Sequence, residues 1–235
     1  MRFRDRAEAG RRLARAVAHL RGTDLVVLGL PRGGVPVAWH VARALGAPLD
    51  LIVVRKVWAP GRPDLAIGAV GEDGTTFLDT RVAEGAGVKA REVPAALDRA
   101  RADLARRLAT LRGDRARVPV AGRTVVVVSD GMATGWTARA ACQAARVRGA
   151  ARVVLAVPVA SACSVHELTT VADAVVCLLR PALFRAVHEW YHDFGPPTDE
   201  EIVTLLRRAR GAELPGRTAP GHGTAGPLRA GGRGV

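Results

Sequence analysis

The sequence predicts an α/β fold, a Rossmann-like central parallel sheet flanked by helices. Short apolar runs alternate with segments of helical spacing, an order that is typical of parallel sheets. The apolar content is 49% and the aromatic content only 4%, which suits buried strands and helices built from Val, Leu and Ala. The expected strands are residues 25–30, 48–54, 125–128, 151–159 and 174–179.

The length of the chain limits the number of domains. With 235 residues, the sequence suits one domain over residues 1–210 that is large enough to bury a full core. Residues 211–235 are rich in Gly and Pro and carry no apolar period, so we expect a disordered tail there.

The first part of the chain predicts two helices. Residues 5–20 place apolar side chains at helical spacing, with Asp5 as a candidate N-cap, and we expect an amphipathic helix. A second helix is expected from Val35 to Leu45, because Gly46 then supplies a common C-terminal stop.

The middle of the chain departs from the alternation of apolar runs and helices. Residues 58–63 read as a loop, and residues 66–77, interrupted at Gly71 to Gly74, read as a hairpin. Pro94 then begins a long helix with a leucine face, and Arg107 is expected on its outer side. A final helix is expected from Thr198 to Leu206.

The stretch from Val125 to Thr137 carries the strongest functional signal. Four valines precede Ser129 and Asp130, and a short loop of Ala133, Thr134, Gly135, Trp136 and Thr137 then opens an Ala-rich helix. Backbone N–H groups and threonine hydroxyls at a helix N-terminus form a favourable site for phosphate. The carboxylate of Asp130 can accept hydrogen bonds from sugar hydroxyls, so a sugar-phosphate site is predicted here.

Two further groups of residues favour an anionic ligand. Arg32, Gly33 and Gly34 follow the first strand, where glycines let backbone N–H groups approach an anion and the guanidinium offers two donors. Arg55 and Lys56 follow the expected second strand, at the sheet edge where α/β proteins bind ligands.

These motifs resemble the type I phosphoribosyltransferase family. The match is closest from Ser129 to Thr137, although the family's first acid is Ser129 here. The resemblance implies a Mg²⁺-dependent reaction between phosphoribosyl diphosphate and a base that the sequence does not identify. It also implies a mobile flap at about residues 57–80, a base-binding hood at about 181–199 and a possible homodimer.

The resemblance also implies a role for each matched residue. Residues 133–137 would bind the 5-phosphate, and Ser129 and Asp130 the ribose. Pyrophosphate would meet Arg32, Gly33 and Gly34, while Asp130, Arg55 and Lys56 would be the catalytic residues. Trp190 and Tyr191 are candidates for contact with the base. No metal-ligating side chain is assigned.

Several alternatives remain open. Loss of the first acid is also compatible with a regulator that binds phosphorylated ligands or nucleic acid. Ser129 before Asp130-Gly131 is similar to a hydrolase nucleophile elbow, with His188 as the available base. The pattern from His188 to His192 fits a zinc-protease motif, but Gly195-Pro196-Pro197 follows too soon for a long helix.

Composition limits partners and location. The net charge is +13, but it is spread along the chain and almost all of it is arginine, so nucleic-acid binding is the weaker interpretation. Three cysteines without metal or redox spacing and the lack of a long apolar segment indicate a cytoplasmic protein that does not enter a membrane.

Overall fold

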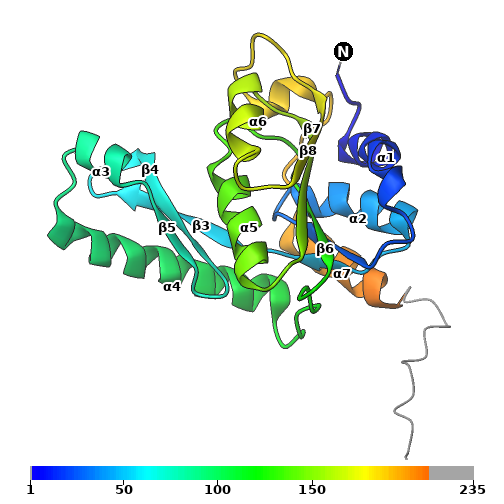
Figure 1. Ribbon diagram of the computed structural model, residues 1–235, viewed down its shortest axis with the longest axis horizontal. Coiled ribbons are helices and arrows are strands. Elements are labelled where there is room, and N and C mark those ends of the chain that lie inside the picture. The colour runs from blue at the N-terminus through cyan, green and yellow to red at the C-terminus, as the bar shows by residue number, and fades with distance from the viewer. Residues whose placement is uncertain (1, 212–235) are drawn as a thin grey trace, which may run out of the picture.

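The computed structural model describes residues 2–211, and its centre is a five-stranded parallel sheet. The strand order is β2-β1-β6-β7-β8, with every neighbouring pair parallel. This confirms the predicted α/β class (Figure 1). The strands are β1 (Leu25–Gly29), β2 (Leu49–Leu51), β6 (Thr124–Val128), β7 (Arg152–Val159) and β8 (Ala174–Leu179).

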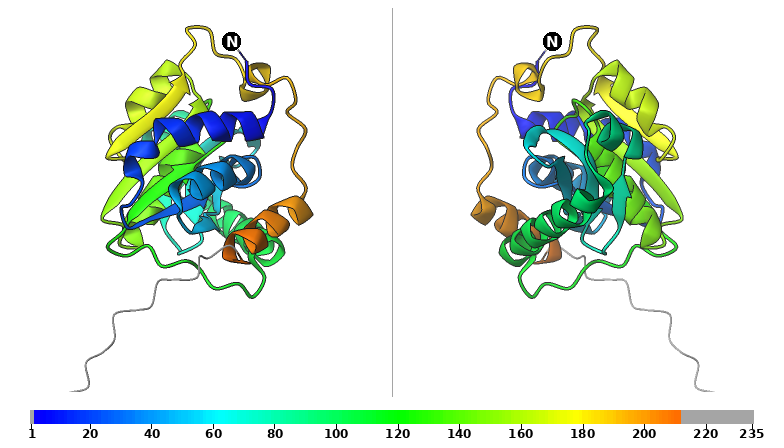
Figure 2. Two further views of the ribbon diagram at one scale, coloured as in Figure 1. Left: turned by 90° about the vertical axis from the view of Figure 1, so that its right-hand side faces the viewer. Right: turned by 90° about the vertical axis from the view of Figure 1, so that its left-hand side faces the viewer.

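Helices cover both faces of this sheet. Successive strand residues point to opposite faces, so Val126 and Val128 pack in one core cluster while Val125 and Val127 pack in another. The first cluster contains α1 (Arg6–Ala16), α2 (Gly34–Leu45) and α7 (Asp199–Gly211), and the second contains α5 (Trp136–Val147) and α6 (Ala162–Leu168). Figure 2 shows α1 and α2 together on one side of the sheet.

A second sheet forms an arm beside the parallel sheet. Strands β3 (Val54–Ala59), β4 (Arg62–Gly71) and β5 (Thr76–Leu78) pair in antiparallel order, and α3 (Thr80–Gly85) and α4 (Val93–Arg112) accompany them (Figure 1). The predicted hairpin over 66–77 is confirmed. The predicted loop at residues 58–63 is wrong, because it contains the turn between β3 and β4 and the strand ends on either side.

The expected single strand over residues 48–54 is also wrong. Strand β2 ends at Leu51, and β3 begins at Val54 in the other sheet. Ile52 and Val53 cross between the sheets and are buried like the strands, so the apolar run continues without a break in the sequence. Arg55 therefore lies within β3 and not at the carboxyl end of a central strand.

A network of buried ion pairs connects the arm to the parallel sheet. Glu72, at the turn after β4, has a fully buried side chain and pairs with Arg112 at 3.3 Å and Arg148 at 3.3 Å. Arg112 also pairs with Asp50 of β2 at 3.0 Å. Because α4, α5, β2 and the β4–β5 turn all contribute to one network, the base of the arm is fixed.

The ends of the described chain also differ from expectation in small ways. Helix α1 stops at Ala16, and a separate 3-10 turn at Ala18–Leu20 replaces its last turn. Helix α7 continues to Gly211, beyond the expected end at Leu206. The predicted disordered tail covers residues 211–235; Gly211 is the last residue of α7, and the remainder lies outside the described residues. Within residues 2–211, no helix has both the length and the apolar character needed to cross a membrane.

Candidate functional site

The N-terminus of α5 presents free backbone donors after β6. Gly135 is the N-cap and makes no side-chain cap, so the N–H groups of Trp136, Thr137 and Ala138 have no partner within the helix. Thr134 is exposed and Thr137 is half-buried. The positive end of the helix dipole lies behind these donors, and the arrangement suits a phosphate group.

The loop before α5 is held in place from the neighbouring helix. The carbonyl of Ala133 accepts hydrogen bonds from the hydroxyls of Ser161 and Ser164 at the start of α6. Gly135 has φ +73°, and a Cβ atom there would lie 3.0 Å from Leu168 of α6. The loop is therefore preorganised before any ligand arrives.

The glycine loop after β1 lies directly against the end of β6. A Cβ atom on Gly33 would stand 1.7 Å from Oδ2 of Asp130, and one on Gly34 would stand 2.5 Å from the carbonyl oxygen of Val128. Only glycine fits at both positions. The predicted pyrophosphate loop and the predicted ribose-binding acid are thus brought together, and the peptide bond between Pro31 and Arg32 is cis.

Asp130 forms an ion pair with Arg6, a residue that the sequence did not point to. Nε of Arg6, in the first turn of α1, donates to Oδ2 of Asp130 at 2.9 Å, and both side chains are nearly buried. Burial raises the pKa of Asp130, and Arg6 acts in the opposite direction. Arg6 also packs its guanidinium 3.9 Å from the Phe194 ring centroid and donates to the carbonyl of Gly195.

The hood segment covers this ion pair. The Tyr191 hydroxyl donates to the carbonyl of Asp130, and its ring packs 5.4 Å from Phe3 and 4.9 Å from Phe194. Both ring neighbours come from this chain, so Tyr191 positions Asp130 and leaves no open face for a base. Nε1 of Trp190 is buried and has no hydrogen-bond partner among the described residues.

The geometry does not support a hydrolase site at Ser129 or a zinc site at His188 and His192. The Ser129 hydroxyl donates to the carbonyl of Gly131 at 3.0 Å, and no described histidine is bonded to it. The 3-10 turn Val187–Trp190 ends before His192, so His188 and His192 do not share a face of an α-helix. Among residues 2–211, no three His, Cys, Asp or Glu side chains converge to hold a metal.

Comparison with known proteins identifies the family. The model of the phosphoribosyl transferase domain matches residues 4–188, which is most of the chain. The chain belongs to the phosphoribosyl transferase family. Two proteins from Mycobacterium tuberculosis strains, each named "Putative phosphoribosyl transferase" (MT0597 and Rv0571c), are 50% identical to it over 207 residues. That match covers 88% of this chain and 47% of each relative, so the chain spans about half their length.

A solved structure supports the same fold. The crystal structure of TT1426 from Thermus thermophilus superposes with a TM-score of 0.74 at 45% sequence identity. The match covers 88% of this chain and 99% of that one. The two proteins therefore share their fold over nearly the whole of TT1426 and most of this chain.

The arm contributes a second basic group beside the phosphoribosyl transferase loops. Arg55 of β3 lies within electrostatic range of Arg107 on α4 and of Arg32. The prediction that Arg107 lies on the outer side of its helix is wrong, since its side chain is only 11% exposed and pairs with Asp199 at 2.6 Å. Its burial depends on the docking of α7, which helical periodicity within α4 does not reveal.

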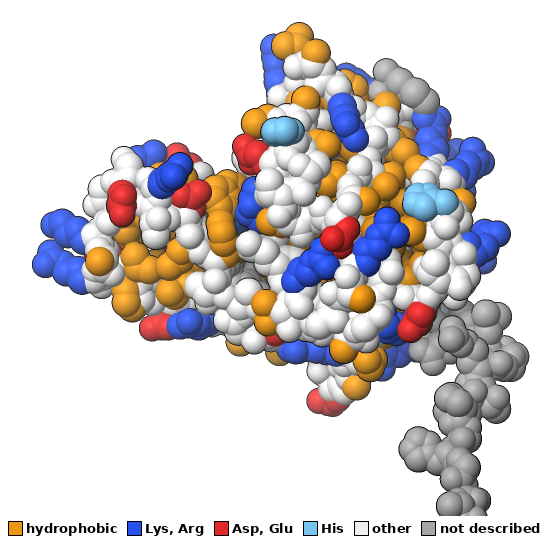
Figure 3. Space-filling model, viewed as in Figure 1, with side chains coloured by type: hydrophobic (Ala, Val, Ile, Leu, Met, Phe, Trp, Pro, Cys, Tyr) orange, Lys and Arg blue, Asp and Glu red, His pale blue; other side chains and the backbone are white. Residues whose placement is uncertain are grey.

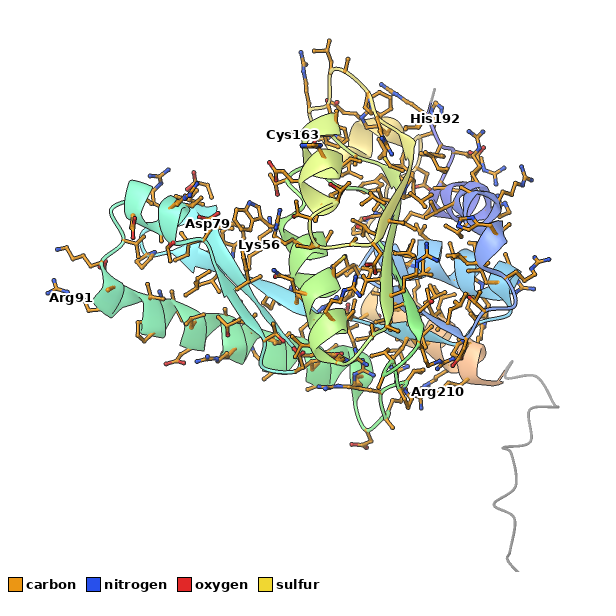
Figure 4. All side chains as sticks on the ribbon, viewed as in Figure 1. Lys56, Asp79, Arg91, Cys163, His192 and Arg210 are labelled. Carbon is orange, nitrogen blue, oxygen red and sulfur yellow. The ribbon has the colours of Figure 1, made fainter. Side chains whose placement is uncertain are left out.

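Lys56 is separated from Arg55 by the strand geometry. Adjacent residues of a strand point to opposite faces, so Arg55 faces α4 while Lys56 takes the other face. The Lys56 ammonium lies 5.2 Å from the ring centroid of Trp58, and burial lowers its pKa. Figure 4 shows Lys56 on the side of the arm toward α5.

Positive charge elsewhere is scattered. On the face shown in Figure 3, Lys and Arg side chains are interspersed with hydrophobic and uncharged groups, without one continuous basic stripe. Many of the arginines form ion pairs within the chain, such as Arg12 with Glu8 and Arg123 with Asp24. Arg55 and Lys56 form no ion pair among the described residues, which sets them apart from these arginines.

Proposed function

We propose that the chain transfers ribose 5-phosphate between phosphoribosyl diphosphate and a nitrogenous base. The observation that carries this proposal is the contact between two loops of the family's domain. The glycine loop at Gly33 touches Asp130, and the free N-terminus of α5 follows Asp130 within a few residues. Three adjacent groups can thus receive a diphosphate, a ribose and a 5-phosphate.

The residues act on the substrate mainly through charge and position. Breaking the bond between ribose and diphosphate develops positive charge on the sugar and negative charge on the leaving group. N–H donors at Trp136 and Thr137 would fix the 5-phosphate, while Gly33, Gly34 and Arg32 would receive the diphosphate. Holding both ends of the substrate aligns the bond to be broken.

The ribose end of the site works with one acid where the family commonly has two. Arg6 donates to the Asp130 carboxylate and gives it a fixed direction, while the Tyr191 hydroxyl holds the main-chain carbonyl of the same residue. Ser129 can offer a neutral hydroxyl to the sugar in place of the missing charge, which weakens a hydrogen bond by about 1 kcal/mol or more. Trp190, within the hood, has a buried indole N–H without a hydrogen-bond partner among the described residues, and we assign it to the base.

We also propose that Mg²⁺ takes part with the diphosphate. Mg²⁺ commonly uses one or two carboxylates together with substrate phosphates and water, and Asp130 offers a carboxylate at this sheet edge for such a role. Its ion pair with Arg6 means that the substrate would supply most of the oxygen ligands. When bound, the metal would neutralise charge on the diphosphate.

A transfer assay tests the proposed reaction. The protein is incubated with phosphoribosyl diphosphate, Mg²⁺ and a panel of purine and pyrimidine bases, and released pyrophosphate is measured. We expect turnover with at least one base, loss of turnover in Asp130→Asn and a much smaller loss in Ser129→Ala. Turnover that needs Ser129 and survives Asp130→Asn would contradict the proposal.

A regulator that binds phosphorylated ligands is the second candidate. It is favoured by Ser129 in place of an acid and by the engagement of Asp130 with Arg6. In that case phosphoribosyl diphosphate would bind without turnover for any base in the panel. Binding of an oligonucleotide with a steep salt dependence would indicate a nucleic-acid partner.

A further inference from the structure

A groove of about 670 Å³ lies between the arm and the second half of α5. Strand β5 of the arm forms one wall, α5 forms another, and residues 169–173, which connect α6 to β8, form the third. A volume of this size is typical of sites that hold small organic ligands. We call this cavity the arm groove.

The arm groove is distinct from the site at the loops after β1 and β6. Asp173, one of its lining residues, accepts the N–H of Val153 at 2.6 Å near the amino end of β7. Asp130 follows the carboxyl end of β6, and in a parallel sheet the two ends of the strands lie at opposite edges. Gln143 lies about 10 Å along α5 from the free N–H groups at the N-terminus of that helix. The groove is therefore a separate site.

The free hydrogen-bonding groups of the arm groove are mainly acceptors. The hydroxyls of Thr169 and Thr170 already donate to carbonyl oxygens in the last turn of α6. The Thr75 hydroxyl donates to Asp73 at 2.7 Å. These hydroxyls keep lone pairs, and the side-chain oxygen of Gln143 is buried without a hydrogen-bond partner among the described residues. A ligand that fits this groove must bring donors.

The charges that line the arm groove balance each other. Arg146 forms an ion pair with Asp173 and also donates to the carbonyl of Ala151 at 3.2 Å. The hydrogen bond from Arg146 lowers the pKa of Asp173, so this carboxylate is charged at neutral pH. Because the guanidinium already has an acid as its partner, an anionic ligand gains little here, and a neutral ligand suits the groove.

The rest of the lining is apolar and includes an aromatic ring. Phe77 of β5 and Val147 of α5 face each other across the sequence from different elements, and Val147 is 67% exposed. The Phe77 ring packs 5.9 Å from the ring of Trp136. Aromatic side chains pack well against flat ring systems, so the lining favours a planar heterocycle.

We propose that the arm groove binds a neutral purine nucleoside with an exocyclic amine, such as adenosine. The base would pack against Phe77, and its amine would donate to the side-chain oxygen of Gln143. The ribose hydroxyls would donate to the threonine oxygens, whose own hydrogens are already used. This choice of ligand follows from the lining of the groove alone and does not depend on the transferase reaction.

Calorimetric titration with adenosine and with purine riboside, which lacks the amine, tests the contact with Gln143. We expect wild type to bind adenosine about three to ten times more tightly than purine riboside, as one additional hydrogen bond implies. In Gln143→Leu the two nucleosides should bind equally. Failure of wild type to bind adenosine, or an unchanged preference in Gln143→Leu, would overturn the proposal.

The variant Val147→Trp tests the position of the nucleoside by filling the groove from its exposed wall. We expect adenosine binding to weaken by about tenfold or more, because most of the buried contact is lost. Ala105→Trp is the matched control, since Ala105 is exposed on α4 and does not line the groove. It should change the dissociation constant less than about twofold. Equal effects of the two variants would overturn the proposal, and this test holds even if Gln143→Leu does not fold.

The transfer assay separates this proposal from the proposed function. We expect Val147→Trp to turn over phosphoribosyl diphosphate as wild type does while it loses adenosine binding. Loss of both would place adenosine at the transferase site and overturn the proposal. Adenosine binding that depends on Gln143 and Val147, in a protein that turns over no base, would keep the arm groove and reject the transferase.

Discussion

Nε of Arg6 lies 2.9 Å from Oδ2 of Asp130, which joins the first turn of α1 to the carboxyl end of β6. The two residues are 124 positions apart, and the pair is enclosed by Phe194, Tyr191 and the glycine loop. The acid that the family resemblance assigns to ribose binding is thus also a structural link between the hood and the sheet.

Arg6→Gln should destabilise the fold by about 3 kcal/mol, because it leaves the nearly buried Asp130 carboxylate without its charged partner. Urea unfolding followed by circular dichroism measures the change. The double variant Arg6→Gln with Asp130→Asn should lose less than the single variant, since no uncompensated charge remains. Equal stability of Arg6→Gln and wild type would show that the pair contributes nothing.

Gly135→Ala should weaken the binding of phosphoribosyl diphosphate and cost about 1–2 kcal/mol of stability. The residue has φ +73°, and a new Cβ would press on Leu168 at 3.0 Å, which shifts the loop that presents the N–H groups of α5. Gly122→Ala is the control, because Gly122 also has φ +73° but nothing lies within 4 Å of its Cβ position. Calorimetry should find weaker binding only for the Gly135 variant. A similar loss in the Gly122 variant would argue against a role for this loop.

The sequence revealed the central strands and the loops after β1 and β6 because buried parallel strands are continuous apolar runs and glycine-rich turns follow them. It could not separate β2 from β3, since Ile52 and Val53 are buried between two sheets and leave no polar boundary. It also missed Arg6 and Arg107. Both lie on helices whose own periodicity looks ordinary, and their partners, Asp130 and Asp199, are 124 and 92 positions away.

Cys142 and Cys163 should differ in reactivity with a thiol reagent. Burial raises the pKa of Cys142 to about 12, so at pH 8 only about one molecule in ten thousand carries the thiolate. Cys163 is exposed, and its thiol makes a hydrogen bond with Glu167. Mass spectrometry after brief labelling of the native protein should find Cys163 modified and Cys142 unmodified until the protein unfolds. Early labelling of Cys142 would contradict its placement in the core.

Asp5→Ala should cost about 1 kcal/mol, because Asp5 caps α1 by accepting a hydrogen bond from the Glu8 N–H at 2.7 Å. That bond lowers the pKa of Asp5. The stabilisation is therefore present above the ordinary aspartate pKa of about 4 and disappears as pH falls through the lower pKa of the folded state. Urea unfolding at pH 7 and at about pH 2.5 should show a larger difference between wild type and variant at pH 7 than at the lower pH. A difference that is the same at both values would mean that the carboxylate does not act as the cap.

Calorimetric titration of wild type and Ser129→Asp with phosphoribosyl diphosphate, with and without Mg²⁺, tests the central claim most directly. The proposed function predicts that wild type binds and that Mg²⁺ strengthens the binding. It also predicts that Ser129→Asp binds more tightly, because a second carboxylate then faces the ribose. Wild type that fails to bind at any Mg²⁺ concentration, while Ser129→Asp binds, would show that the fold keeps its phosphate loops but that this chain does not use the substrate.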